Sequence, residues 1–109
     1  MTDAGDRTAR FGLLRVSGAT QLAVAAAEVT HTTGSGTVLN TVAVELSNVG
    51  ALNVFFRIGG STTVTTTNGG VLRPGESKWR DVPRGTVLRF IGAGAGPTTV
   101  IVDEYAVES

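Results

Sequence analysis

Hydrophobic and polar residues alternate in short runs along most of this chain. The clearest run is residues 37–48, where Val42, Val44 and Leu46 share one side of an extended backbone and Ala43, Glu45 and Ser47 share the other. A period of two places successive side chains on opposite faces of a sheet, with one face toward a core. This run therefore predicts a β-strand with one buried face.

Other runs of the same kind lie before and after it, at residues 21–29, 52–58, 77–82, 86–92 and 98–107. Residues 21–29 are rich in alanine and also permit a helix, but Leu22 and Val24 share one parity and favour a strand. The consecutive residues Val100, Ile101 and Val102 predict a strand that is covered on both faces, and thus central in its sheet.

Turn signals separate these runs. Residues 31–36 (HTTGSG) predict a turn between two antiparallel strands, and residues 48–50 (NVG) predict a hairpin between runs 37–48 and 52–58. Residues 73–76 (RPGE) fit a type II turn, with Pro and Gly at its central positions. Residues 61–67 (STTVTTT) fit an exposed strand or an ordered loop, and residues 92–97 (GAGAGP) fit a flexible hairpin tip.

Strands separated by turns every 8 to 12 residues or so are typical of all-β domains. The expected fold is an antiparallel β-sandwich or a jelly-roll-like small barrel with an extended N-terminal arm. Residues 1–19 form the expected arm and residues 20–109 the single β-sandwich domain. The arm carries Arg7, Arg10 and Arg15, with Phe11 among its few apolar anchors. It is either a terminus with one docked strand, residues 11–16, or a segment that reaches a neighbouring subunit.

The charge balance excludes some classes of partner. Nine basic and nine acidic residues cancel, so no long-range field draws in nucleic acid or an anionic membrane. No apolar stretch is long enough to span a bilayer, and no signal-peptide pattern is present near Met1. Charged residues are only 17% of the chain, which fits either a surface covered by a partner or one made polar by Thr, Ser, Asn and Gly.

Candidate catalytic groups are few. His31 is the only histidine and there is no cysteine, so we expect an exposed loop histidine and no metal or cofactor site. Asp103 and Glu104 are adjacent on a strand and must point to opposite faces, so they cannot form an acid/base pair by themselves. The glycines of residues 92–96 lack the following helix and Lys-Ser/Thr pair of a phosphate-binding loop. The sequence thus predicts a protein that is not an enzyme.

Aromatic residues and arginines are the remaining candidates for interaction. Trp79, Phe55 and Tyr105 could form a platform for a sugar, whereas Trp79 is expected to be a core or subunit-interface anchor. Phe55 has the opposite parity to its apolar neighbours, so either both faces of its strand are covered or it marks a contact surface. Arginines of the second half can pair within the monomer or with carboxylates of another subunit: Arg57, Arg73, Arg80, Arg84 and Arg89.

Residues 46–105 combine a strand ending in Asn, a strand with Arg before Gly, a Thr-rich stretch, a Leu-x-Pro-Gly turn and a terminal strand with VDEY. In this combination the chain resembles small β-sandwich virion proteins of tailed bacteriophages and gene transfer agents. The resemblance implies a capsid decoration or cement protein that binds and stabilises the head shell. Head–tail connector, spike or tail components remain alternatives, as does a carbohydrate- or receptor-binding β-module.

The resemblance also implies the partners and the location. These are the major capsid protein or other virion subunits, a homo-oligomer with a trimer favoured, and a virion assembled in the host cytoplasm. It transfers no individual binding residue to this chain. The interaction candidates therefore come from the residue pattern itself: Arg7, Arg10, Phe11, Arg15, Phe55, Arg57 and Trp79.

Overall fold

The computed structural model describes residues 13–15, 19–34, 37 and 39–107. This part of the chain forms nine strands and no helix, which confirms the all-β prediction. The strands are β1 (Leu13–Arg15), β2 (Thr20–Val24), β3 (Val29–Thr32), β4 (Thr41–Asn48), β5 (Val54–Ile58), β6 (Gly70–Leu72), β7 (Ser77–Pro83), β8 (Val87–Gly92) and β9 (Thr98–Val107).

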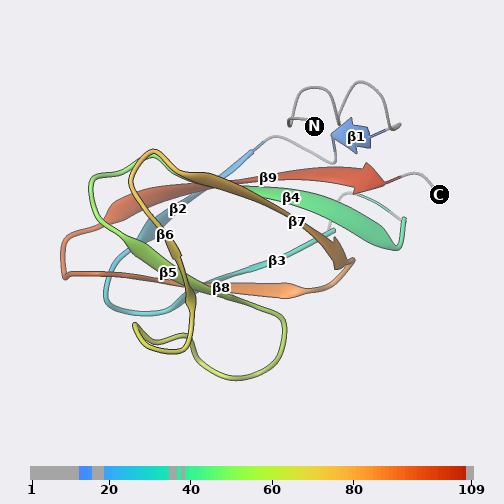
Figure 1. Cartoon of the computed structure of the whole chain (residues 1–109). Coiled ribbons are helices and arrows are strands. Elements are labelled where there is room, and N and C mark those ends of the chain that lie inside the picture. The colour runs from blue at the N-terminus through green and yellow to red at the C-terminus, as the bar shows by residue number, and fades with distance from the viewer. Residues whose placement is uncertain (1–12, 16–18, 35–36, 38, 108–109) are drawn as a thin grey trace.

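The strands form two antiparallel sheets that pack as layers (Figure 1). Sheet A has the order β1-β9-β4-β7, and β2 also pairs with β9, next to the stretch that β1 covers. Sheet B has the order β3-β8-β5-β6. The β-sandwich prediction is confirmed, and β9 lies inside its sheet as the Val100–Val102 run predicts.

The strand order is that of a jelly roll. The pairs β2 with β9, β3 with β8, β4 with β7 and β5 with β6 are the rungs of one long antiparallel hairpin. Rolling this hairpin on itself brings β4 against β9 and β5 against β8. An eight-stranded double-sheet jelly roll is defined by this wrapping.

The core lies between the sheets and follows the alternation in the sequence. Val42, Val44 and Leu46 point inward from β4 and are fully buried, as predicted. The other buried side chains come from both layers: Val24, Val54, Phe56, Leu72, Val82, Leu88, Phe90, Val100 and Val102. Transfer of this apolar surface from water is the main force that holds the two layers together.

The predicted hairpin between runs 37–48 and 52–58 is wrong, because β4 lies in sheet A and β5 in sheet B. Asn48, almost completely buried, holds the corner between them. Its Nδ2 donates to the carbonyls of Leu52 (2.7 Å) and Leu72 (2.9 Å), and its Oδ1 accepts from the Gly50 N–H (3.0 Å). These bonds satisfy backbone groups that the change of layer takes out of the ladders.

The predicted strand over residues 21–29 is also wrong. The chain leaves sheet A after Val24 and enters sheet B at Val29, so two short strands replace one. At this corner the carbonyl of Ala25 accepts a hydrogen bond from the Gly92 N–H (2.7 Å). Of residues 31–36, predicted as a turn that joins two antiparallel strands, His31 and Thr32 belong to β3, and Thr33 and Gly34 form a turn.

The turn predicted at residues 73–76 is confirmed. The Glu76 N–H donates to the Arg73 carbonyl (2.9 Å), and Gly75 has a φ of 80°. A positive φ at this position of a type II turn favours glycine. The turn carries the chain from β6 in sheet B to β7 in sheet A, and so closes one side of the sandwich.

Candidate functional site

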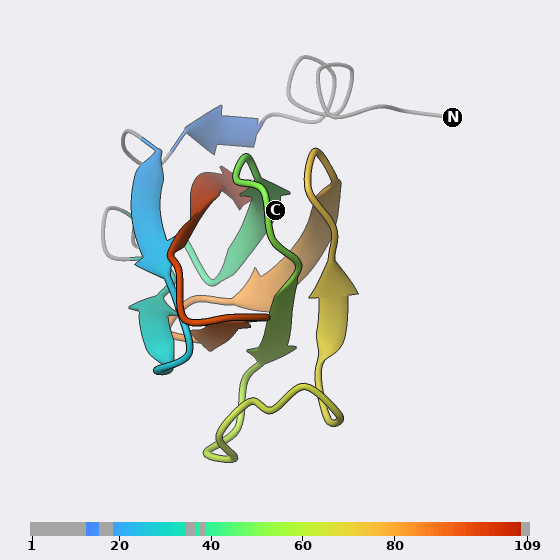
Figure 2. The same ribbon diagram turned by 90° about the vertical axis from the view of Figure 1, so that its left-hand side faces the viewer.

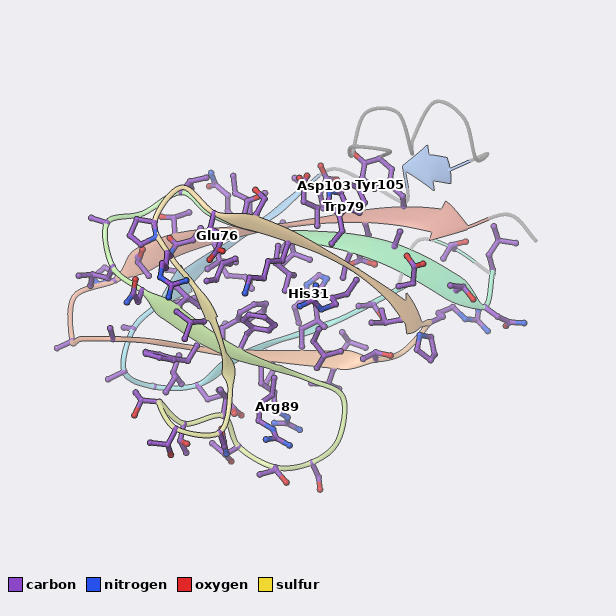
Figure 3. All side chains as sticks on the ribbon, viewed as in Figure 1. His31, Glu76, Trp79, Arg89, Asp103 and Tyr105 are labelled. Atoms are coloured by element: carbon purple, nitrogen blue, oxygen red, sulfur yellow. The ribbon has the colours of Figure 1, made fainter. Side chains whose placement is uncertain are left out.

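The outer face of sheet A carries a pair of aromatic side chains. Trp79 on β7 and Tyr105 on β9 flank β4, and their ring centroids are 5.5 Å apart with planes tilted by 32° (Figure 3). Ala43, which lies across from Tyr105 on β4, is fully buried although it points away from the core. A small residue between the two strands lets the rings meet over it.

Two carboxylates lie directly opposite each other beside this pair. Glu45 on β4 is the cross-strand neighbour of both Asp103 on β9 and Trp79 on β7. Burial raises the pKa of the Glu45 carboxyl above its ordinary value of 4.5, and the negative charge of Asp103 raises it further. A hydrogen bond with the Trp79 side chain lowers this pKa and so opposes both effects. Like charges across a strand pair are destabilising.

The outer face of sheet B carries a half-buried apolar row. Phe55 on β5 lies between Val71 on β6 and Ile91 on β8, and all three point away from the core. In the next outward row of the same face, Arg57 lies directly opposite Arg89. Phe55 therefore belongs to a surface row rather than to the central core.

The segment between β5 and β6, residues 59–69, is an ordered loop that packs beside these arginines. Val64 is its buried residue, with 2% of its surface exposed. The Glu28 carboxylate accepts the Val64 N–H (2.9 Å) with one oxygen and the Arg89 guanidinium (2.9 Å) with the other. Arg89 also donates to the Gly60 carbonyl (3.2 Å), and Arg57 donates to the Asn68 carbonyl (2.9 Å).

The loop also carries its own hydrogen bonds. The Asn68 side chain accepts the Thr65 N–H (2.7 Å) and donates to the Thr63 carbonyl (3.0 Å). Outside these bonds the loop presents exposed threonines: Thr62, Thr63, Thr65, Thr66 and Thr67. Of the two alternatives for this stretch, the structure has the ordered loop, and its exposed surface is uncharged.

The expectation of an exposed loop histidine is wrong. His31 lies in β3 with its side chain 14% exposed, and its Nε2 contacts the carboxylate of Glu104 on β9 of the other sheet. The second oxygen of Glu104 accepts the Gly34 N–H (2.7 Å). His31 shares inward parity with Val29, so the strand directs it between the layers (Figure 3).

This polar pair links the sheets but does not form a recognisable catalytic set. Asp103 points to the outer face and Glu104 to the inner one, as predicted for adjacent strand residues. The described part of the chain contains no group of three or more His, Cys, Asp or Glu side chains that could hold a metal ion. Nor does this part contain a helix of sufficient length and hydrophobicity to cross a membrane.

The structure separates the predicted interaction residues. Phe55 and Arg57 share the outer face of sheet B, whereas Trp79 lies on the outer face of sheet A and not in the core, which corrects one of its two expected roles. Arg15 is in β1, with its backbone opposite Tyr105, and its side chain is outside the part that the structure describes. The remaining candidates, Arg7, Arg10 and Phe11, lie outside the described residues.

Two charged sites escaped prediction from the sequence. Glu104 shares its parity with Val100 and Val102, so an inward carboxylate in the terminal strand was a signal for a buried partner. The Glu28–Arg89 pair joins residues 61 positions apart, and no local pattern marks it. For Arg89, the structure shows the alternative in which the arginine pairs within the monomer.

The fold and its surfaces define a small jelly-roll β-sandwich with two distinct outer faces. Comparisons with protein-family models, curated proteins and solved structures find no match for the chain.

Proposed function

We propose that the chain is a non-enzymatic structural protein of a phage particle, which binds the head shell as a decoration or cement protein. The observation that carries this proposal is the loop of residues 59–69. Glu28 accepts the N–H of the buried Val64 in the middle of the loop, and the threonines on both sides of Val64 are exposed and uncharged. A loop held in one conformation loses little entropy when it docks on a partner, which suits a stable lattice contact.

Two further features support the proposal. The jelly roll recurs among viral capsid domains, although the same fold also serves lectins and cupins, so this is an analogy at the level of fold. The resemblance of residues 46–105 to small virion proteins covers the end of β4, all of β5 to β8 with the whole loop, and most of β9. On this proposal the major capsid protein is the partner, and the protein is found in the virion after assembly in the host cytoplasm.

The test is co-sedimentation of the purified protein with undecorated phage heads. We expect binding at a fixed ratio to capsid subunits, and loss of binding in Thr63→Asp/Thr66→Asp, which adds charge to the exposed loop. Thr41→Asp is the control, because Thr41 is also exposed but lies at the start of β4. No binding to heads, together with copurification with tails, would contradict the proposal and favour a connector, spike or tail component.

The aromatic pair on sheet A favours a second candidate function, a glycan-binding module. Trp79 and Tyr105 lie on one face with the Glu45 and Asp103 carboxylates beside them. Aromatic rings pack against the C–H faces of sugars, and carboxylates accept hydrogen bonds from sugar hydroxyls. Quenching of Trp79 fluorescence on titration with soluble glycans, absent in Tyr105→Ala, would support this function over head binding.

A further inference from the structure

We infer that β2 is a self-association edge, through which a second copy of this chain extends sheet A about a two-fold axis. Among the described strands, β2 pairs only with β9, and it lies at the margin of the sandwich (Figure 2). Within the part of the chain that is described, no loop forms backbone hydrogen bonds with residues 20–24. Their outward N–H and C=O groups can therefore pair with another strand.

The edges of the two sheets differ in how well they are protected. Edge strand β7 carries Lys78, Arg80 and Asp81 and ends at Pro83, features that oppose pairing with another strand. Edge strands β1, β3 and β6 have three or four residues each. Strand β2 has five residues, TQLAV, with neither charge nor proline. It is thus the least protected edge among the described strands.

The side chains of β2 fix the register of the pairing. Leu22 and Val24 point toward the core, while Gln21 and Ala23 are exposed. An antiparallel pair centred on Leu22 places Leu22 opposite its own copy and Gln21 opposite the partner's Ala23. This register keeps inward residues on the inward face of both subunits, which a shift by one residue would reverse.

The pairing also completes the cover of Leu22. This side chain packs against the core but is only partly buried, and no other described strand lies beyond β2 on its side. A second Leu22 beside it would exclude water from the same margin of the core. A pair of five-residue strands is a small interface, so we expect a dimer whose formation depends on concentration. The two-fold symmetry of this dimer differs from the trimer that the resemblance to virion proteins favours.

The test compares oligomeric mass by analytical ultracentrifugation over a range of concentrations. Wild-type protein should shift from the monomer to the dimer mass. In Gln21→Lys/Ala23→Lys, each lysine faces a lysine of the partner, and we expect the dissociation constant to rise roughly tenfold. In Gln21→Lys/Ala23→Glu, each lysine instead faces a glutamate, and the dimer should persist. Both positions are exposed, so these variants should fold, as circular dichroism will verify.

Ser77→Lys/Thr66→Lys is the matched control, since it adds the same charge at exposed positions on β7 and on the loop. It should leave the dimer unchanged. A wild-type monomer at all concentrations, or an oligomer that the lysine pair on β2 does not weaken, would overturn the inference. Neither result bears on head binding, so the two proposals can fail separately.

Discussion

At the scale of single residues, two carboxylates each accept hydrogen bonds from a specific side chain and a specific backbone N–H. Glu104 reaches from one sheet to His31 of the other and accepts the Gly34 N–H as well. The Glu28 carboxylate likewise accepts hydrogen bonds from the Arg89 guanidinium and the Val64 N–H. Glu45 is the exception, since its cross-strand neighbour Asp103 has the same sign. Removal of the carboxylate should therefore destabilise the fold at Glu104, loosen the loop of residues 59–69 at Glu28 and stabilise the fold at Glu45.

Replacement of Glu104 should destabilise the fold. Glu104→Ala leaves the His31 Nε2 and the Gly34 N–H without their acceptor in a mostly buried site, which costs about 3 kcal/mol of unfolding free energy. Glu104→Gln keeps a carbonyl oxygen that can accept one bond, so its loss should be smaller. Urea unfolding measures both, with Glu76→Gln as a control in the exposed β6–β7 turn. Equal stability of Glu104→Ala and the wild type would show that the His31–Glu104 pair does not stabilise the fold.

Replacement of Glu45 should stabilise the fold at neutral pH. Because burial and Asp103 raise the pKa of Glu45 in the folded state, the folded protein disfavours the ionised form. Stability is then lost as the pH rises from 4.5 through the raised pKa. Glu45→Gln removes the charge and keeps an acceptor for Trp79, so we expect a gain of about 0.5 kcal/mol at pH 7. The gain should shrink near pH 4. Unfolding curves of Glu45→Gln and the wild type at both pH values measure this difference in stability.

At the scale of elements, the loop of residues 59–69 behaves as a separate attachment to sheet B. It contributes one buried side chain, Val64, and its link to the sheet depends on Glu28 and the two arginines. The strands beneath it are held by their own ladders and core. Loss of the link should therefore loosen the loop and leave the sandwich intact.

Glu28→Ala tests this separation. It removes the acceptor of the Val64 N–H and the counter-charge of Arg89. We expect faster amide exchange at Val64 and proteolytic cleavage within residues 61–68, whereas amides in β4 and β9 keep their protection. Hydrogen exchange followed by mass spectrometry reads both regions at once. Uniform loss of protection across β4 and β9 would mean that the loop is part of the cooperative core.

Elements were predictable where the alternation is local. The alternation of Val42, Val44 and Leu46 predicted the buried face of β4, and adjacency predicted that Asp103 and Glu104 point to opposite faces of β9. The changes of layer after Val24 and after Asn48 were missed, because a strand that crosses to the other sheet has the same local pattern as a hairpin. The His31–Glu104 site was missed because 73 residues separate the pair, and only the register of two sheets joins them.

At the scale of the whole molecule, both sheets share one core. Leu46 and Val102 of sheet A and Phe90 and Leu88 of sheet B belong to the same buried cluster. The pairing of β2 with β9 joins the beginning of the described fold to its end, for example Leu22 to Val100. Neither sheet can bury its inner face without the other, so the domain should unfold as one cooperative unit.

Phe90→Ala tests whether the sheets are coupled. Phe90 is the largest completely buried side chain among the described residues, and its truncation should cost about 3 to 5 kcal/mol. Its strand β8 lies in sheet B, whereas the only tryptophan, Trp79, lies in sheet A and reports on that sheet by fluorescence. If the core is shared, unfolding followed by Trp79 fluorescence and by far-ultraviolet circular dichroism shifts by the same amount. A fluorescence transition that stays at the wild-type position while the circular dichroism transition moves would show that sheet A holds its structure without sheet B.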